Sequence, residues 1–512
     1  MLLHDCYLKN VEKHPDKIAV KSDSGTLTYQ AFYFASQRLA DYLVLKGLQK
    51  GDRVVLYMSN SLELCISIYA VLMAGGVFVV VNPTTKKDKL CYILNDCSAF
   101  ALISDRHDGI NQSQLQEQLP SLQLIIYDRT GDPAMISLET IVQESKTPVR
   151  HPRIISIDLA ALIYTSGSTG NPKGVTMAHY NMVSAAQSII IYLENASSDI
   201  ILNVLPLSFD YGLYQLLMAL TFGGTLVLEK DFLYPAEIVK KLKNETITGF
   251  AGVPTLFALL FKMDFAQHDF PHLRYISNTG AALPVEFIKK LGTLFPKTRI
   301  YSMYGLTECK RVAYLPPIDI DKKPHSVGIA MPDCEVCILD EDKQPVPCGQ
   351  AGELYVRGTN VMQGYWNMPA ETKQVLVEGK HGYEKMLRTG DIFKMDEDGY
   401  LYFLGRKDDI IKSRGEKVSP KEVENVLYML DGVEEAAVIG VKDEILGQAV
   451  KAFVKVAPYR SLSITDIIRH CSQNLENYCV PRHIEFVESL PKNPNGKIDK
   501  KKIVEMMTVE SE

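Results

Sequence analysis

The stretch YTSGSTGNPKGV, residues 164–175, concentrates glycines, hydroxyl residues and one lysine within a few positions. Glycine permits positive φ angles and close backbone approach, so successive N–H groups can point at phosphate oxygens. The residues that this stretch offers to a phosphate are Thr165, Ser166, Gly167, Ser168, Thr169, Gly170 and Lys173. We therefore predict a phosphate-binding loop, with a flexible Gly/Ser turn as the alternative.

This loop differs from the common nucleotide P-loop. The pattern G-x-x-x-x-G-K-[ST] needs a glycine before its lysine and a hydroxyl residue after it. In this chain Pro172 precedes Lys173 and Gly174 follows it. The loop is therefore expected to serve a different phosphate chemistry.

Five further stretches follow the loop along the chain. They are NTGAALP (278–284), YGLTE (304–308), TGD (389–391), GRKDDIIKSRGEKVSPKEVE (405–424) and PNGKID (494–499). In this order the six stretches resemble the signatures of the adenylate-forming superfamily, which includes acyl-CoA ligases, adenylation domains of nonribosomal peptide synthesis and firefly luciferase. The resemblance covers nearly the whole chain.

The resemblance implies a nucleotide site. Tyr304 would stack on adenine, Asp391 would accept both ribose hydroxyls, and the fork of Arg406 would contact ribose or phosphate. The small residues that would admit the flat adenine ring are Gly280, Ala281 and Ala282. The alternatives are a buried aromatic beside a tight turn for Tyr304, a polar turn for TGD, and a surface ion pair for Arg406.

The resemblance also implies catalytic residues. Thr307 would bond the α-phosphate, and Glu308 would ligate Mg²⁺, a hard cation that prefers carboxylate oxygen. Lys497 would enter between the carboxylate and the α-phosphate and neutralise charge growing at phosphorus. The alternatives are a helix start for the Thr-Glu pair and a solvated lysine in a basic tail for Lys497.

The implied reaction has two halves. A carboxylate attacks the α-phosphorus of Mg·ATP and gives an acyl-adenylate and pyrophosphate. The thiol of CoA, or of phosphopantetheine on a carrier protein, then displaces AMP and forms a thioester. Between the halves the small domain would rotate about a hinge at Asp408, a residue that is otherwise a loop charge.

The acid pocket is read from PLSFDYGLYQ (206–215) and YGLTECKRVAYLPP (304–317). Asp210 lies where amino-acid-activating relatives pair a carboxylate with the substrate's α-ammonium, or else it is a helix N-cap. By motif offset the pocket would be lined by Tyr211, Tyr214, Met303, Arg311 and Val312. These bulky walls favour a compact acid.

The same two stretches are most similar to stand-alone ligases that load proline or another small amino acid onto a carrier protein. The leading expectation is therefore activation of an amino acid such as L-proline, loaded onto a separate carrier protein in secondary metabolism. The alternative is an AMP-forming acyl-CoA ligase for a fatty or other organic acid. A light-emitting or non-catalytic relative is a further class, which retention of Lys497, Glu308 and Asp391 disfavours.

Apolar strand-like runs that alternate with helix-length amphipathic segments predict an α/β fold with parallel sheets covered by helices. Residues 64–82 and 211–229 each read as an apolar helix, a Gly-Gly pair and a strand, which favours two related α/β layers over membrane spans. Short strands from Cys334 onward predict a small β region. We expect a large domain over 1–407 and a small mobile α+β domain over 408–512.

Composition excludes some function classes. The formal net charge of -6 argues against a nucleic-acid binder. The ten cysteines are scattered, and the close pair Cys334 and Cys337 has no second pair at zinc-site distance. The first residues show no secretory signal, so we expect a cytoplasmic protein with reduced thiols.

Overall fold

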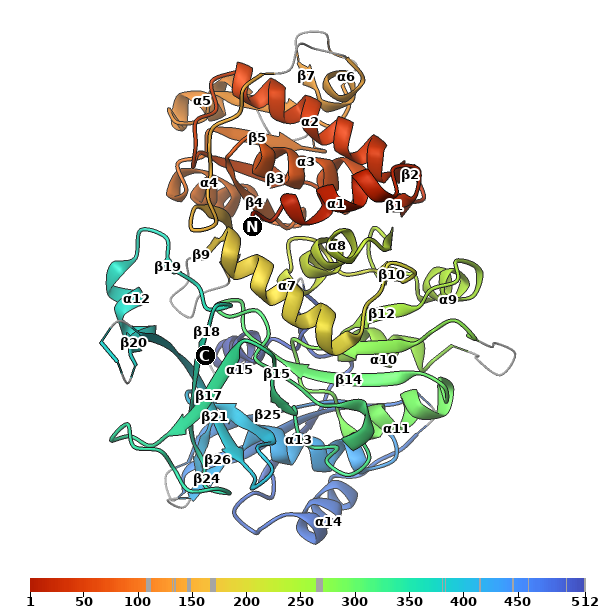
Figure 1. Ribbon diagram of the computed structural model, residues 1–512. Helices are drawn as coiled ribbons and strands as arrows, with labels where there is room; N and C mark the ends of the chain where they lie inside the picture. The colour runs from red at the N-terminus through yellow and green to blue at the C-terminus, as the bar shows by residue number, and fades with distance from the viewer. Residues whose placement is uncertain are drawn as a thin grey trace.

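The chain folds into a large N-terminal domain followed by a smaller C-terminal domain (Figure 1). The computed structural model describes residues 1–106, 112–130, 132, 135–144, 149–165, 172–263, 270–379, 381–382, 384–413, 416–443, 446–458, 460–493 and 495–510. The large domain consists of two α/β layers and a β region, which confirms the predicted fold class.

The first layer is built on a nine-stranded sheet with strand order β16-β15-β14-β13-β12-β10-β11-β1-β2. The pairs from β14 through β1 are parallel, and β2, β15 and β16 are antiparallel additions at the two edges. The bounds are β1 Ile18–Ser22, β2 Gly25–Thr28, β10 Ile200–Asn203, β11 Thr225–Leu228, β12 Gly249–Gly252, β13 Tyr275–Asn278, β14 Arg299–Tyr304, β15 Ala313–Tyr314 and β16 Ile329–Ala330.

The second layer is built on an eight-stranded sheet with strand order β19-β9-β8-β4-β3-β5-β6-β7. Its bounds are β3 Arg53–Tyr57, β4 Val77–Val81, β5 Ala101–Ser104, β6 Leu124–Tyr127, β7 Ile136–Ser137, β8 Leu159–Thr165, β9 Lys173–Ala178 and β19 Gly364–Tyr365. Strand β4, VFVVV, is buried on both faces, as expected for a central strand of a parallel sheet.

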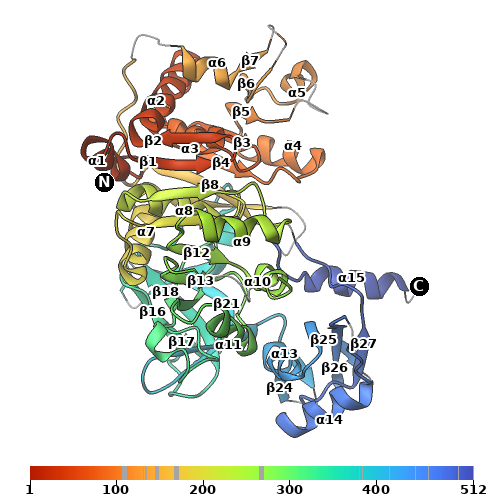
Figure 2. The ribbon, with the colours of Figure 1, turned by 90° about the vertical axis from the view of Figure 1, so that its right-hand side faces the viewer.

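Helices cover both sheets and fill the space between them. Those of the large domain are α1 Asp5–Lys13, α2 Tyr29–Leu45, α3 Leu62–Met73, α4 Lys87–Asp96, α5 Gln112–Gln118, α6 Leu138–Gln143, α7 His179–Leu193, α8 Asp210–Phe222, α9 Pro235–Asn244, α10 Pro254–Leu260, α11 Val285–Leu294 and α12 Pro369–Val375, with a short 3₁₀ turn at Pro317–Asp319. Figures 1 and 2 place α8 between the two sheets. Nearly every residue of α8 is buried, as expected for a helix that is apolar on all sides.

Both predicted helix, Gly-Gly and strand units are confirmed. Helix α3 is followed by Gly75-Gly76 and then β4, and α8 is followed by Gly223-Gly224 and then β11. Gly223 ends α8 in the left-handed conformation at φ 81°, which glycine adopts without steric cost. None of the helices in the described ranges has the length and apolar character that crossing a membrane requires.

The β region and the small domain each have a sheet of their own. The β region pairs β17 Cys334–Leu339, β18 Gly352–Gly358, β20 Leu376–Glu378, β21 Lys385–Met395 and β22 Leu401–Arg406. The small domain pairs β23 Ile411–Ser413, β24 Glu416–Val418, β25 Val433–Asp443, β26 Gly447–Val456 and β27 His483–Phe486, and its helices are α13 Pro420–Met429, α14 Ile464–Asn474 and α15 Lys500–Glu510. Figure 2 shows the small domain, in blue, standing apart from the two layers. Because β22 and β23 belong to different sheets, we propose the domain boundary that the sequence predicts after residue 407.

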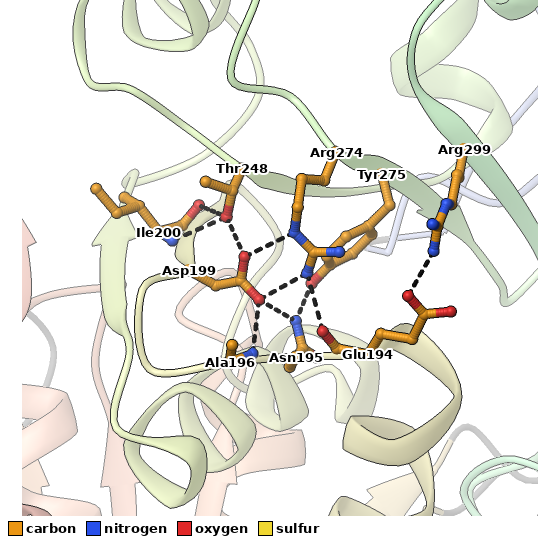
Figure 3. Close-up of polar contacts among 9 residues, drawn as sticks. All are labelled: Glu194, Asn195, Ala196, Asp199, Ile200, Thr248, Arg274, Tyr275 and Arg299. Atoms are coloured by element: carbon orange, nitrogen blue, oxygen red, sulfur yellow. Dashed lines mark hydrogen bonds and ion pairs between the residues drawn. The ribbon is translucent and has the colours of Figure 1, made fainter.

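A buried carboxylate fastens the amino-terminal ends of the parallel strands β10, β12 and β13 (Figure 3). Asp199, which precedes β10, accepts hydrogen bonds from Arg274 Nε at 2.9 Å and Nη2 at 2.7 Å, and from Thr248 Oγ1 at 2.8 Å. Burial opposes ionisation, yet the bonds from Arg274 hold the pKa of Asp199 below its ordinary value. A structural network thus occupies the amino-terminal ends of these strands, and their carboxyl-terminal ends are available for a site.

Candidate active site

Part of the predicted site lies at the carboxyl ends of the parallel strands in the nine-stranded sheet. Residues 253–255 follow β12, residues 279–282 follow β13, and residues 305–312 follow β14. In open α/β sheets this edge is where ligands bind. The Asp199 network lies at the other edge, so structural and site residues are separated along each strand.

The predicted phosphate loop joins β8 to β9. These strands pair antiparallel, with Thr165 opposite Lys173. The ammonium of Lys173 lies 5.3 Å from the ring centroid of Tyr365. The remaining predicted loop residues lie outside the described residues; they are Ser166, Gly167, Ser168, Thr169 and Gly170.

The same tyrosine connects Lys173 to Glu308. The Tyr365 hydroxyl donates to Glu308 Oε1 at 2.8 Å, and Glu308 and Thr307 lie in a turn after β14. The alternative of a helix start at this pair is wrong. One oxygen of Glu308 accepts the hydrogen bond from the Tyr365 hydroxyl, and this bond orients the second oxygen. The carboxylate could therefore supply one ligand to a phosphate-bound Mg²⁺.

Tyr304, Asp391 and Arg406 form one cluster. The Tyr304 hydroxyl donates to Asp391 Oδ2, and Arg406 Nε lies 3.4 Å from Asp391 Oδ1. Burial raises the pKa of Asp391 to about 6, while Arg406 and the tyrosine hydroxyl oppose that rise. The TGD segment lies inside β21 and not in a polar turn, so that alternative is wrong. The Asp391 carboxylate is thus buried, and a polar ligand can take the place of Arg406, its more distant partner.

A cavity of about 820 Å³ opens between the two domains. Its wall includes Gly280, Ala281, Ala282, Phe403, Arg406 and Lys497. Gly280 has φ 88°, and a Cβ at that position would lie 2.9 Å from Lys497 Cε and 3.2 Å from Phe209 Cζ. The positive φ favours glycine at this turn, and the absent Cβ leaves space for the lysine stem.

Lys497 reaches from the small domain into the large one. Its ammonium lies 5.1 Å from the ring centroid of Phe209. The preceding Gly496, at φ 77°, accepts a hydrogen bond through its carbonyl from Thr255 Oγ1 at 2.6 Å. Burial lowers the pKa of Lys497, and the neighbouring Asp210 carboxylate opposes that shift. The solvated-tail alternative for Lys497 is wrong in this domain arrangement.

The predicted acid-pocket residues surround the start of α8. The helix begins at Asp210 itself, with Phe209 as its N-cap and no side-chain capping bond, so the N-cap alternative for Asp210 is wrong. Asp210 Oδ2 instead lies 3.8 Å from Arg311 Nη1. The guanidinium of Arg311 lies 4.7 Å from the ring centroid of Tyr211, whose hydroxyl is 2.8 Å from Ser277 Oγ.

The other pocket candidates are also buried. Tyr214 has no exposed surface, and Met303 and Val312 are buried in the same apolar core. The Met303 sulfur accepts the Tyr192 hydroxyl of α7 at 3.0 Å, and the Val312 N–H donates to the Tyr304 carbonyl. The bond between Val312 and Tyr304 closes the segment that carries Lys310 and Arg311.

Asp408 lies in the exposed turn between β22 and β23, on the segment that connects the two domains. Arg406, at the end of β22, is 54% exposed and pairs with the buried Asp391, so its partner is not a surface carboxylate. The candidate hinge therefore lies two residues after Arg406, a residue of the nucleotide cluster.

Sequence reasoning missed Lys310, Thr255 and Tyr365. Lys310 is fully buried, and burial lowers its pKa to about 8 while Asp210 opposes the shift. Its sequence context, TECKR, reads as a polar turn with a solvated charge. The usable signal was its position, two residues after Glu308 and next to Arg311.

Comparison with known proteins places these features in a family. The sequence matches the family "AMP-binding enzyme" over residues 8–366 and "AMP-binding enzyme C-terminal domain" over residues 422–497. It is 34% identical to the long-chain-fatty-acid–CoA ligase of Yersinia pestis, over 95% of this chain and 91% of that one. It is 30% identical to a linear gramicidin synthase of Brevibacillus parabrevis, over 98% of this chain and 6% of that protein.

A solved structure agrees over almost the full length. The anthranilate CoA ligase AuaEII in complex with anthranoyl-AMP superposes with a TM-score of 0.91 at 27% identity, covering 99% of this chain and 97% of that one. Both the large and the small domain are included in that match. The chain belongs to the AMP-binding enzyme family and is an AMP-forming ligase.

Proposed function

We propose that this ligase activates a compact polar organic acid as its acyl-adenylate and transfers the acyl group to the thiol of coenzyme A. The observation that carries the proposal is the buried, charged surface at the head of α8. Asp210, Tyr211, Tyr214, Lys310 and Arg311 are each at most 6% exposed.

This surface disfavours a long-chain acid. A long alkyl chain needs an apolar wall, because methylene groups that cover an ammonium or guanidinium leave it buried without compensation. Lys310 and Arg311 would face that cost, whereas a short acid with a polar group would reduce it. The Yersinia pestis relative supports the CoA acceptor, and the side chains at α8 support a different acid.

In the proposed first step, a carboxylate oxygen of the acid bonds to the α-phosphorus of ATP. The bond from that phosphorus to the bridging oxygen breaks, and pyrophosphate leaves. Lys497 donates to the oxygens that gain charge, in a half-buried position where such donation is stronger than in water. Thr307 bonds the α-phosphate.

The nucleotide is held by groups on both sides of the cavity. Asp391 accepts the ribose hydroxyls, Arg406 contacts ribose or phosphate, and Tyr304 lies against the adenine with the backbone of residues 280–282. Lys173 and the loop from Thr165 hold the departing β- and γ-phosphates. Glu308 would hold a Mg²⁺ ion, which would supply charge neutralisation at the phosphates.

The second step needs Lys497 out of the way of the thiol. Rotation of the small domain about Asp408 withdraws the Gly496 turn and opens the same face to the acceptor. The thiol sulfur bonds to the acyl carbon, the acyl-to-phosphate bond breaks, and AMP leaves.

A second candidate is an amino acid, such as L-proline, loaded onto a separate carrier protein in secondary metabolism. The buried Asp210 favours it, because the carboxylate is 3.8 Å from its Arg311 partner, beyond hydrogen-bond distance, and can accept an ammonium. The similarity to the linear gramicidin synthase agrees with this candidate.

The experiment that separates the two candidates follows the acceptor. The purified enzyme is supplied with ATP, Mg²⁺ and a mixture of compact acids, and either coenzyme A or a phosphopantetheinylated carrier protein is added. We expect AMP release and an acyl-CoA detected by mass spectrometry. Acylation of the carrier alone would favour the amino-acid candidate, and absence of AMP with both acceptors would contradict the ligase proposal.

A further inference from the structure

Lys310 occupies a costly position. Its side chain has no exposed surface, and its backbone has φ 60°, the left-handed conformation that residues other than glycine and asparagine seldom adopt. Burial of an ammonium and a left-handed backbone both cost free energy, and such strain concentrates at binding sites. A ligand that pairs with the Lys310 ammonium would offset the free-energy cost of its burial.

Hydrogen-bond donors around Lys310 lack acceptors. Within the described ranges, Lys310 Nζ, Arg311 Nε and Tyr214 Oη are buried and have no hydrogen-bond partner. The Lys310 ammonium faces the Tyr214 ring at 5.4 Å from its centroid. Two buried acceptors near this group, Gln215 Oε1 and Asn360 Oδ1, are also unpaired, and Asn360 donates through Nδ2 to the carbonyls of Cys309 and Arg311. Unpaired donors thus outnumber unpaired acceptors around Lys310, so a group that completes the set supplies acceptors.

The charges point the same way. Arg311 and Asp210 face each other at 3.8 Å and offset each other. Lys310 interacts electrostatically with Asp210 and also with Glu308, but it has no ion pair of its own within 4 Å in the described part of the chain. Asp210, Lys310 and Arg311 together carry one positive charge in excess, before Lys497 and Glu308, the residue proposed for Mg²⁺, are counted.

The cluster adjoins the reacting centre. Lys497 lies against Phe209, the residue before Asp210, and its ammonium interacts electrostatically with both Asp210 and Arg311. An acid whose carboxylate meets Lys497 therefore lies within electrostatic reach of Asp210 and Arg311, the two charged neighbours of Lys310.

We propose that Lys310 binds a second carboxylate of the acid, so that the ligase acts on a short dicarboxylic acid. This inference rests on the proposed function and narrows its substrate class. The distal carboxylate accepts from Lys310 Nζ, with Arg311 Nε and the Tyr214 hydroxyl as further donors. Charge-assisted bonds of this kind are roughly twice as strong as neutral ones.

Matched acids test the proposal. ATP–pyrophosphate exchange is measured with succinate against butanoate and with glutarate against pentanoate, pairs that differ at the distal end, and with L-proline. In the wild-type enzyme we expect kcat/KM for the better diacid to exceed that of its matched monoacid. In Lys310→Met we expect about a 100-fold loss with the diacid and a gain with the monoacid, which misfolding cannot produce.

Two further variants sharpen the result. Lys310→Arg keeps the charge and is expected to retain the preference for the diacid. Lys322→Met removes an exposed lysine that pairs with Asp319 on the surface, and it is expected to leave both kcat/KM values unchanged.

The outcomes separate this inference from the proposed function. Exchange with the monoacid or L-proline in preference to both diacids overturns the role of Lys310 and leaves the ligase proposal standing. An unchanged preference in Lys310→Met also overturns it. Absence of exchange with every acid, in wild-type enzyme that is folded and binds ATP, contradicts the proposed function itself.

Discussion

The hydroxyl of Thr255, in the large domain, donates a 2.6 Å hydrogen bond to the carbonyl of Gly496, the residue before Lys497. This bond holds the turn that carries the lysine. The approach is close, since a Cβ at residue 496 would lie 2.9 Å from the same hydroxyl. The two domains are thus joined next to Lys497, the residue that we propose for adenylation.

Thr255→Val is expected to lower the rate of pyrophosphate exchange about fivefold, the effect of losing one net hydrogen bond. The KM for ATP and the transfer of the acyl group from preformed adenylate are expected to stay unchanged, because Thr255 acts through the Gly496 turn. Thr293→Val, on the exposed face of α11, is the matched control. A parallel loss in the transfer step would show that Thr255 does not act through domain docking.

Lys497→Ala is expected to lower pyrophosphate exchange by about 10² to 10³, the range for removing one donor from developing negative charge. Acyl transfer from synthetic acyl-adenylate should persist, since we propose that Lys497 leaves the site for that step. Lys442→Ala, which changes an exposed lysine of β25, serves as the control. Full exchange activity in Lys497→Ala would refute the assigned role.

Asp391 predicts a pH dependence of nucleoside binding. Burial raises the pKa of this carboxylate to about 6, so it gains a proton as the pH falls through 6 and loses acceptor capacity for ribose. Adenosine, which carries no titrating phosphate, is expected to bind more weakly at pH 5 than at pH 8 in calorimetric titrations. In Asp391→Asn the affinity should be low and independent of pH, and a pH-independent wild-type affinity would contradict the prediction.

Two buried histidines predict acid sensitivity of the fold. The Leu3 N–H donates to His179 Nδ1 at 3.1 Å, and the ring of His4 meets that of His179 edge-on at 5.8 Å. Burial lowers the pKa of each histidine to about 4. His151 lowers the pKa of His4 further, His4 lowers that of His179, and Asp5 opposes both shifts. For His179, Asp158 opposes the lowering as well.

Because these folded-state pKa values lie below the ordinary value near 6.5, the unfolded chain binds protons first as the pH falls. The free energy of unfolding should be constant with respect to these groups above pH 6.5 and should fall between about pH 6.5 and 4. Urea titrations at successive pH values measure this. His179→Gln should flatten the slope, whereas His14→Gln, at the exposed end of α1, should leave it unchanged.

Much of the fold followed from local pattern. The runs at residues 64–82 and 211–229 show helix, Gly-Gly and strand in one order, and the structure forms α3–β4 and α8–β11 there. These elements are apolar and buried, so the period of the hydrophobic residues and the glycine breaks determine them. The sequence predicts the short strands of the β region only as a group. Their individual pairing joins residues far apart in the chain, so local pattern does not determine it.

The site was predictable where a motif carries it, and less so where packing decides. Tyr304, Asp391 and Arg406 come together from separate motifs as the resemblance implies. The sequence does not predict the burial of Lys310, because a lysine in a polar stretch is usually solvated, whereas here its ammonium is buried and faces the ring of Tyr214 in α8. The capping alternative for Asp210 is wrong because α8 begins at Asp210 itself, and Phe209 holds the N-cap position without a side-chain bond.

The central claim is that this ligase adenylates a compact polar acid, and ATP–pyrophosphate exchange across an acid panel tests it most directly. The panel contains short monocarboxylic and dicarboxylic acids, small amino acids and long-chain fatty acids at equal concentration. We predict exchange with compact polar acids and background exchange with long-chain fatty acids. Exchange with long-chain fatty acids alone would contradict the account.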